Sequence, residues 1–250
     1  MPHQQVPGSE QCSASLELIE ARERLIVALD FPAPSEALDL VHRLEGTCQW
    51  FKVGLELYLT AGRSIVETLR NHGYSVFLDL KLHDIPNTVA AAVRSVAPLG
   101  AQLLTVHASG GPAMLAAAAE AAARVANPPK LLAVTVLTSM DQSQLTATGV
   151  PRLPAEQVQY LAKMAFASGI HGIVCSPEEA AGVRAALPDS ILVTPGIRSA
   201  GSAIADQKRI ATPAAALAAG ANYLVVGRPI TRADRPAEAA QAILDEMSTS

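Results

Sequence analysis

The stretch VFLDLKLHDIPNT, from Val76 to Thr88, decides the fold of this chain. It begins with the residues of a β-strand, and side chains along a strand point alternately to its two faces. Asp79 and Lys81 therefore share one face, while the leucines beside them point to the other. A carboxylate and an ammonium group at the end of an apolar strand have to be paired and hydrogen-bonded. The pattern predicts either a structural ion pair or a functional site at this strand end.

Similar apolar segments recur along the whole chain. The predicted strands are Leu25–Asp30, Trp50–Gly54, Ser75–Leu80, Ala101–His107, Leu131–Leu137, Gly172–Cys175, Ser190–Thr194 and Asn222–Val226. Helical patterns follow them, at Glu36–Leu44, Leu59–Asn71, Asn87–Ala97, Pro112–Val125, Ala155–Ala167, from Pro177 onward, Thr212–Ala219 and Arg235–Met247. Continuous apolar strands that alternate with helices are typical of a covered parallel sheet. Eight such units predict an α/β fold, a single-domain (β/α)8 TIM barrel over residues 21–250, with a doubly wound open sheet as the alternative.

Polar residues at the strand ends favour the barrel over the open sheet. They occupy the C-terminal end of nearly every predicted strand, at Asp30, Lys52, Asp79, Lys81, His107, Thr138, Arg198 and Arg228. In a barrel these ends meet on one rim, where active sites are built. The sequence therefore predicts a charged site at that rim.

Composition excludes several classes of protein. Half of the residues are hydrophobic. The net charge is -4, so the protein has no overall positive field that would attract nucleic acid. No apolar run is long enough to span a membrane. Cys12, Cys48 and Cys175 lack the spacing of a metal site and predict a reducing compartment. Residues 1–20 lack the regions of a secretory signal and are expected to be a flexible tail. We therefore expect a cytoplasmic protein without nucleic-acid or membrane partners.

Two segments near the end of the chain predict an anion site. Gly227 and Arg228 follow the last strand, where barrels commonly bind phosphate and where an arginine supplies a fork of donors. The alternative is an arginine in a surface pair. The segment Pro195–Gln207 is long and rich in small residues, which predicts a mobile lid with Arg198 and Gln207 as its polar contacts. The alternative is a surface loop without a role.

The charged cluster restricts the chemistry. Lys52 and Lys81 are predicted on adjacent strands, with Asp79 between them, so that alternating charges are paired. No nucleophile motif and no metal-type spacing is present. His83 and His107 are expected to be structural. Lysine and aspartate chemistry on a phosphorylated small molecule remains: proton transfer, decarboxylation or Schiff-base formation.

The central stretch also resembles a known family. LDLKLHDIPNT, with LIVALD, FKVG, VTVLTSM, TPGIR and VVGRPIT, resembles the bacterial type of the orotidine 5'-monophosphate decarboxylase family, from about Leu25 to Arg232. The resemblance implies a carboxy-lyase that converts orotidine 5'-monophosphate to UMP and carbon dioxide, the last step of de novo UMP synthesis. It implies no metal and no organic cofactor, and a homodimer with its active sites at the subunit interface.

The resemblance also assigns roles to individual residues. Lys81 would donate the proton to C6 of the pyrimidine, with Asp79 beside the substrate carboxylate and Lys52 supporting Asp79 and reaching the ribose. The remaining implied contacts are Asp30 on the ribose, Thr138 and Pro195 at the base, Arg198, Gln207, Gly227 and Arg228 on the phosphate and its lid, and Asp84, Ile85 and Thr88 from the partner subunit.

Two alternatives stay open at this point. One is a barrel like 3-keto-L-gulonate 6-phosphate decarboxylase, a family with the same D-x-K-x-x-D core that uses magnesium. The HDIPNT and TPGIR segments argue against it. The other is a non-catalytic barrel that only binds nucleotides, against which the presence of Asp79 and Lys81 argues.

Overall fold

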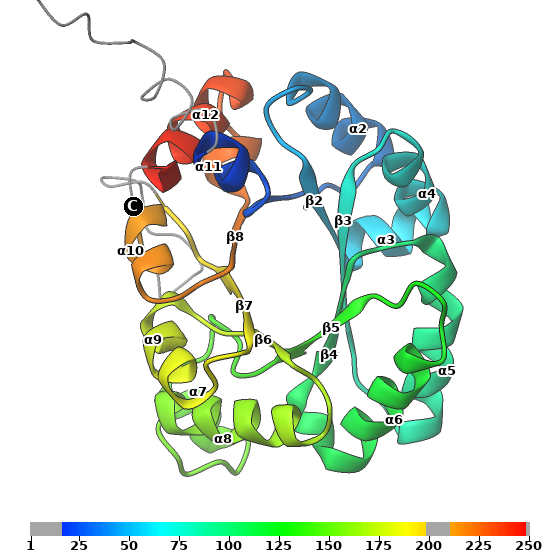
Figure 1. The fold of residues 1–250 in the computed structure, drawn as a ribbon, viewed down its shortest axis with the longest axis vertical. Helices are drawn as coiled ribbons and strands as arrows, with labels where there is room; N and C mark the ends of the chain where they lie inside the picture. Colours follow the sequence, from blue (N-terminus) through cyan, green and yellow to red (C-terminus); the bar gives the residue numbers. More distant parts are fainter. Residues whose placement is uncertain (1–16, 199–210, 249–250) are drawn as a thin grey trace, which may run out of the picture.

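The computed structural model describes residues 17–198 and 211–248. Eight parallel strands stand at the centre, and helices surround them (Figure 1). The strands are β1 Leu25–Ala28, β2 Trp50–Gly54, β3 Ser75–Leu82, β4 Leu103–His107, β5 Lys130–Val134, β6 Gly172–Val174, β7 Ile191–Pro195 and β8 Tyr223–Val226. Neighbours in sequence pair with each other, and β8 pairs with β1. The closed barrel confirms the predicted fold class and rules out the open sheet.

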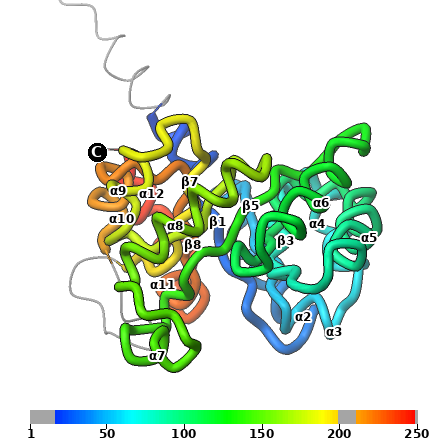
Figure 2. The backbone as a smooth tube through the Cα atoms, turned by 90° about the horizontal axis from the view of Figure 1, so that it is seen from below, coloured from blue at the N-terminus to red at the C-terminus, as the bar shows by residue number. Residues whose placement is uncertain are grey.

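The helices form the outer layer. They are α2 Pro34–Arg43, α3 Leu55–Ala61, α4 Arg63–Asn71, α5 Pro86–Val96, α6 Gly111–Ala123, α7 Gln142–Ala147, α8 Pro154–Ala167, α9 Pro177–Ala186, α10 Pro213–Ala218, α11 Arg228–Thr231 and α12 Pro236–Ser248. Short 3-10 turns occupy Ala97–Leu99 and Ala108–Gly110. The short helices α7 and α11 follow β5 and β8 and lie at the same end of the molecule (Figure 2).

The helix expected over Leu59–Asn71 is two helices, α3 and α4. Gly62 separates them with φ 65° and ψ -151°, a conformation that only glycine adopts without strain. α7 and α11 were not predicted, because segments of four to six residues show no helical period. The expectation of eight helices is therefore wrong in number, although each expected helical segment contains helix.

Alternation along the strands produces two separate cores. One set of side chains points into the barrel, and its buried members include Ile26, Trp50, Phe77, Leu103 and Leu132. The other set points outward and packs against the helices in a much larger cluster. Burying each large apolar side chain contributes about 1.5–3 kcal/mol, so both faces of every strand stabilise the barrel.

Gly172 shows how tightly the barrel interior is filled. It lies on β6 opposite Leu132 of β5. A Cβ atom at Gly172 would overlap the side chain of Leu132. Glycine is required here because a neighbouring strand already fills the space.

The described residues include parts of the expected N-terminal tail and of the expected lid, Pro195–Gln207. Residues 17–22 are helical, so the described part of the expected tail, residues 17–20, is regular structure. Ile197 forms an isolated parallel bridge with Ala211, so residues on either side of the segment 199–210 lie next to each other.

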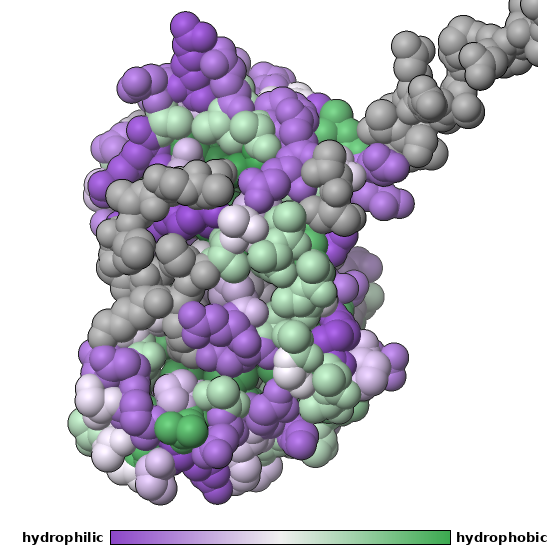
Figure 3. All heavy atoms as spheres, turned by 90° about the vertical axis from the view of Figure 1, so that its left-hand side faces the viewer, coloured by the Kyte–Doolittle hydropathy of each residue, from purple (hydrophilic) through white to green (hydrophobic). Residues whose placement is uncertain are grey.

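In the part of the chain that the structure describes, no helix is long and apolar enough to cross a membrane. The face seen in Figure 3 mixes hydrophilic and weakly hydrophobic residues, with strongly hydrophobic ones only in small spots.

Candidate active site

A cavity of about 270 Å³ lies at the C-terminal ends of the strands. Most of the residues that the sequence predicted for the site line it: Asp30, Lys52, Asp79, Lys81, Thr138, Pro195, Arg198, Gly227 and Arg228. Lys81 and the corner at Gly227 and Arg228 therefore share one cavity, as expected for a single rim. The contribution of each residue to catalysis or binding remains a prediction.

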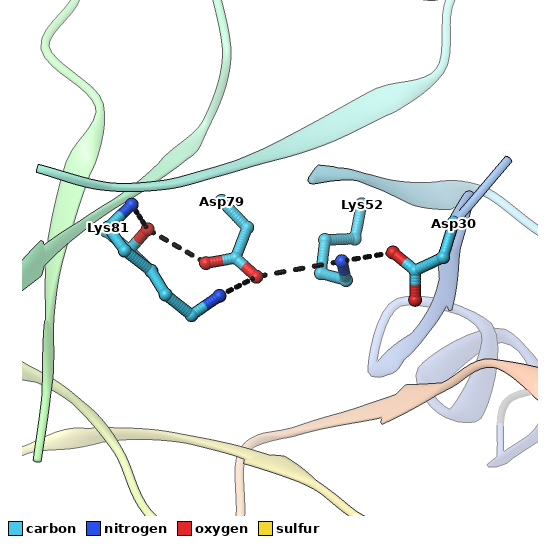
Figure 4. A network of polar contacts seen from close by, with 5 residues as sticks. Asp30, Lys52, Asp79 and Lys81 are labelled. Atoms are coloured by element: carbon cyan, nitrogen blue, oxygen red, sulfur yellow. Dashed lines mark hydrogen bonds and ion pairs between the residues drawn. The ribbon is translucent and has the colours of Figure 1, made fainter. Parts of the chain in front are cut away.

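Four charged side chains form a row along one side of this cavity (Figure 4). Lys52 Nζ lies 2.8 Å from Asp30 Oδ1 and 3.6 Å from Asp79 Oδ2. Lys81 Nζ lies 2.7 Å from the same Asp79 oxygen. The row places Asp79 between the two lysines, as the order of the strands predicts. Each charge has an oppositely charged neighbour, which offsets the cost of removing it from water.

The central pair of the row stays ionised despite its burial. Burial alone would raise the pKa of the Asp79 carboxyl, but the charges of Lys52 and Lys81 and hydrogen bonds from Lys81 and Thr105 lower that pKa below its usual value. Burial likewise lowers the pKa of Lys52, and the carboxylates of Asp79 and Asp30 more than reverse this. The network therefore holds the Asp79 carboxylate beside the Lys52 ammonium group across the neutral pH range.

An irregularity in β3 sets the position of Lys81. Leu78 pairs with Leu104 of β4 and Leu82 pairs with Val106, so the three residues from Asp79 to Lys81 lie opposite the single residue Thr105. Lys81 has φ 50° and is the only non-glycine residue with positive φ in the described ranges. Such a conformation is uncommon outside glycine and persists only where its surroundings hold it.

Gly54 is a site residue that the sequence analysis missed. It ends β2, and a Cβ atom there would lie 2.9 Å from Lys52 Nζ and 3.3 Å from Asp30 Oδ1. The absence of a side chain lets the Lys52 ammonium group reach Asp30. The FKVG segment could have indicated this role, because Gly54 comes two residues after Lys52 on the same strand and therefore lies on the same face.

An apolar wall forms much of the remaining lining of the cavity. Its residues are Val134 on β5 and Val136 just after it, Val174 on β6, Val193 on β7, Val225 on β8 and Phe77 on β3. This wall was not predictable from the sequence, because valines inside a barrel also serve as core. Charges beside such a wall interact more strongly than they would in water.

Arginine and glycine residues occupy the predicted anion site. Arg198 and Arg228 line the cavity with Gly196 and Gly227. Arg198 is 9% exposed, and its Nη1 donates to the carbonyl oxygen of Ile197 over 2.8 Å. A guanidinium group presents several donors in a plane and binds phosphate well. Gln207, the other predicted contact of the lid, lies outside the described residues.

Three predicted residues do not line this cavity. Asp84, Ile85 and Thr88 are exposed at the start of α5, and Ile85 is 67% exposed. The Asp84 carboxylate accepts the backbone N–H of Ile85 over 2.6 Å. Exposure leaves these residues accessible to another molecule, and their role in a partner subunit's site stays a prediction.

Two histidines lie beside the charged row. The rings of His83 and His107 are 5.4 Å apart. Burial lowers the pKa of His107 below 6.5, and the neighbouring His83 and Lys81 lower it further, against a smaller opposing effect of Asp79. His107 is therefore neutral near pH 7.

No group of three or more potential metal ligands occurs within residues 17–198 and 211–248.

Fold and site together define the class of protein, an enzyme built on a (β/α)8 barrel with lysine and aspartate side chains at its C-terminal rim. The model of the Orotidine 5'-phosphate decarboxylase / HUMPS family matches residues 23–243. The chain belongs to this family.

Individual relatives agree with this assignment. The orotidine 5'-phosphate decarboxylase of Halorhodospira halophila is 53% identical over 228 residues, which cover 91% of this chain and 97% of the relative. The Pseudomonas aeruginosa protein of the same name is 50% identical over 224 residues, covering 89% and 97%. The crystal structure of the Lactobacillus acidophilus protein of that name matches with a TM-score of 0.80 at 40% identity, covering 90% of this chain and 98% of that chain.

Proposed function

We propose that this protein is an orotidine 5'-phosphate decarboxylase, a carboxy-lyase that converts orotidine 5'-phosphate to UMP and carbon dioxide in pyrimidine biosynthesis. One observation carries the proposal at the level of chemistry: the Lys81 ammonium nitrogen is held 2.7 Å from the buried Asp79 carboxylate at the barrel mouth. Membership of the family supports the choice of substrate.

The geometry suits a reaction that passes through a carbanion. Loss of carbon dioxide from C6 leaves an electron pair in the plane of the pyrimidine, where the ring π system does not delocalise it. Stabilisation must then come from a fixed positive charge, and Lys81 supplies one that Asp79 has already oriented. Lys81 then donates a proton to C6 as general acid. The lysine and aspartate side chains supply this chemistry without a metal ion or an organic cofactor.

The rest of the cavity supplies binding energy. In our proposal Asp30 and Lys52 hold the ribose, and Thr138 and Pro195 line the base pocket. Arg198, Gly227 and Arg228 bind the phosphate, together with Gln207. Contacts with the phosphate, far from C6, can be used to assemble the site around the reacting centre.

A homodimer completes the proposed site. Asp84, Ile85 and Thr88 would enter the cavity of the neighbouring subunit, and a second carboxylate would then flank Lys81. Their exposure supports this role, and so do Leu55 and Leu59 on α3, which are 46% and 80% exposed. α3 and α5 follow the adjacent strands β2 and β3, so these apolar side chains belong to one region of the rim.

We also place the enzyme in the cytoplasm. Cys48 is a buried free thiol, as expected in a reducing compartment. Cell fractionation followed by immunoblotting tests this placement, and recovery of the protein outside the cytoplasmic fraction would contradict it.

The decisive test is an absorbance assay with orotidine 5'-phosphate. We expect the wild-type protein to turn it over equally with and without EDTA. Lys81→Ala should lose at least about a thousandfold in kcat, since both the fixed charge and the proton donor disappear. Lys163→Ala, at an exposed position on α8, is the matched control and should retain full activity.

Three results would contradict the proposal. Absence of turnover by the wild-type protein would remove the assigned reaction. Normal turnover by Lys81→Ala would remove that lysine from the role of acid. Loss of activity in EDTA, restored by magnesium, would favour the metal-dependent sugar-phosphate decarboxylase instead.

A further inference from the structure

Thr105 is a polar residue inside the barrel, directly beside the charged row. It belongs to β4, and its side chain is 0% exposed. The barrel-facing position before it on β4, Leu103, is apolar, and β5 places Leu132 beside it. A hydroxyl at such a position is costly unless it is hydrogen-bonded. Both of its hydrogen bonds go to the two residues that the proposed reaction depends on.

The direction of these two hydrogen bonds is fixed by chemistry. The Lys81 backbone N–H donates to Thr105 Oγ1 over 2.8 Å. The Thr105 hydroxyl donates to Asp79 Oδ1 over 2.9 Å. A backbone N–H cannot accept and an ionised carboxylate cannot donate, so the hydroxyl has a single orientation. Thr105 thus joins the backbone of Lys81 to the side chain of Asp79.

Thr105 restrains both the Asp79 carboxylate and the backbone of Lys81. Asp79 Oδ2 faces Lys81 Nζ, while Oδ1 faces Thr105, so the plane of the carboxylate is fixed from both sides. The Lys81 backbone has φ 50° at the irregularity opposite Thr105. In this segment the threonine hydroxyl accepts the Lys81 N–H that a regular ladder would direct to a β4 carbonyl.

We propose that Thr105 is a positioning residue of the active site, which holds the Asp79 carboxylate and the Lys81 backbone in the arrangement that decarboxylation requires. The inference rests on the proposed function for its kinetic consequence only. Its structural consequence, a restrained Asp79, is measured without substrate.

The kinetic test compares Thr105→Val with Thr105→Ser. Valine keeps the shape and removes the hydroxyl, while serine retains it. Loss of a hydrogen bond to a charged group predicts a fall in kcat of about 10- to 100-fold for Thr105→Val. The KM for orotidine 5'-phosphate should stay within about threefold, since the ribose and phosphate contacts are made by other residues. Thr105→Ser should recover most of the lost kcat.

Thr135→Val is the matched control. Thr135 is a buried strand-end threonine whose hydroxyl donates to the carbonyl oxygen of Val174 over 2.8 Å, away from the charged row. The Thr135→Val variant loses one buried hydrogen bond at a nearby strand end and should keep its kcat. If Thr105→Val does not fold, as judged by circular dichroism, Thr105→Ala removes the same hydroxyl without adding a methyl group beside Asp79.

The second measurement is an NMR titration of protein labelled with ¹³C at aspartate carboxyls. Asp79 should titrate at a higher pH in Thr105→Val than in the wild type and in Thr135→Val, because it has lost a donor. The titration needs no substrate, so it tests the role of Thr105 even if the wild-type protein does not turn over orotidine 5'-phosphate. Absence of turnover would count against the proposed function alone. An unchanged Asp79 titration, or a kcat loss no larger than that of Thr135→Val, overturns the role of Thr105.

Discussion

Single atoms decide how the charged row is arranged. Lys52 Nζ reaches Asp30 Oδ1 over 2.8 Å by passing over Gly54, which has no side chain. Asp79 accepts from Lys81 through one oxygen and from Thr105 through the other. The arrangement depends on these few contacts, so small changes at neighbouring residues should alter function more than stability.

Gly54→Ala tests this at the position nearest to Lys52. The new Cβ atom would lie 2.9 Å from Lys52 Nζ, too close for both to keep their places. We expect kcat/KM to fall at least about tenfold, because the ammonium group must leave Asp30 or shift toward the cavity. Steady-state assays with orotidine 5'-phosphate measure the loss.

Gly182→Ala is the control for that variant. Gly182 is exposed on α9, where an added Cβ meets only the flexible end of Gln159. Its activity should be unchanged. Equal kcat/KM for Gly54→Ala and wild type would show that the row tolerates a displaced Lys52.

His107 should make stability depend on pH. The pKa of His107 is lowered below 6.5 in the folded protein. At pH values between the folded-state pKa and 6.5, His107 is therefore mostly protonated in the unfolded chain and mostly neutral in the folded one. The free energy of unfolding therefore falls as pH falls through this range. His83, Lys81 and Asp79 are the charged or titratable groups that contribute to this shift.

Urea unfolding at pH 7, 6 and 5 measures this dependence. His107→Gln should lose less stability than the wild type between pH 7 and pH 5. His72→Gln, at an exposed position, should behave like the wild type. If all three proteins respond equally to pH, protonation of His107 is not the cause.

Secondary structure was predictable wherever a regular period runs through the segment. Each predicted strand overlaps an observed strand, because apolar runs between turn residues are a local signal. The break at Gly62 was missed, since a glycine within a helical pattern is usually tolerated. The irregularity in β3 was also missed, because it depends on a contact with Thr105, 24 residues away along the chain from Lys81.

Gly172→Ala tests packing between strands. The methyl group would overlap Leu132 on β5, and overpacking of a filled core costs about 1–3 kcal/mol. We expect the urea midpoint to fall by a corresponding amount. Gly182→Ala should instead be neutral or stabilising, since alanine favours a helix over glycine by about 1 kcal/mol. A Gly172→Ala midpoint equal to that of the wild type would mean that the barrel interior has spare room.

At the scale of the molecule, the position of the site followed from topology. Parallel strands in a closed barrel bring all their C-terminal ends to one rim, so the polar residues at Asp30, Lys52, Asp79 and Lys81 had to meet. The apolar wall and Thr105 were not predictable in this way. Their residue types also occur as ordinary core, and only their contacts give them a place in the site.

The proposed dimer interface can be tested at Ile85. Ile85 is 67% exposed just before α5, and a charge there should oppose burial in a dimer interface. We expect Ile85→Arg to raise the dimer dissociation constant at least about tenfold and to lower activity at dilute enzyme concentrations. Analytical ultracentrifugation measures the first effect.

Leu153→Arg provides the comparison. Leu153 is 56% exposed just before α8, on another side of the barrel, and its charge should leave the assembly unchanged. A wild-type protein that sediments as a monomer at micromolar concentration, or an Ile85→Arg variant that dimerises normally, would contradict the proposed interface.

The pairing of β8 with β1 has a consequence for how the protein behaves at high concentration. Because every strand of the sheet has a partner on each side, no row of free backbone groups is available for another chain to extend. Aggregation through strand addition must therefore wait until the β1–β8 seam opens. Pairing along that seam, in register from Leu25–Leu224 to Val27–Val226, therefore protects the protein against aggregation in addition to its surface charge.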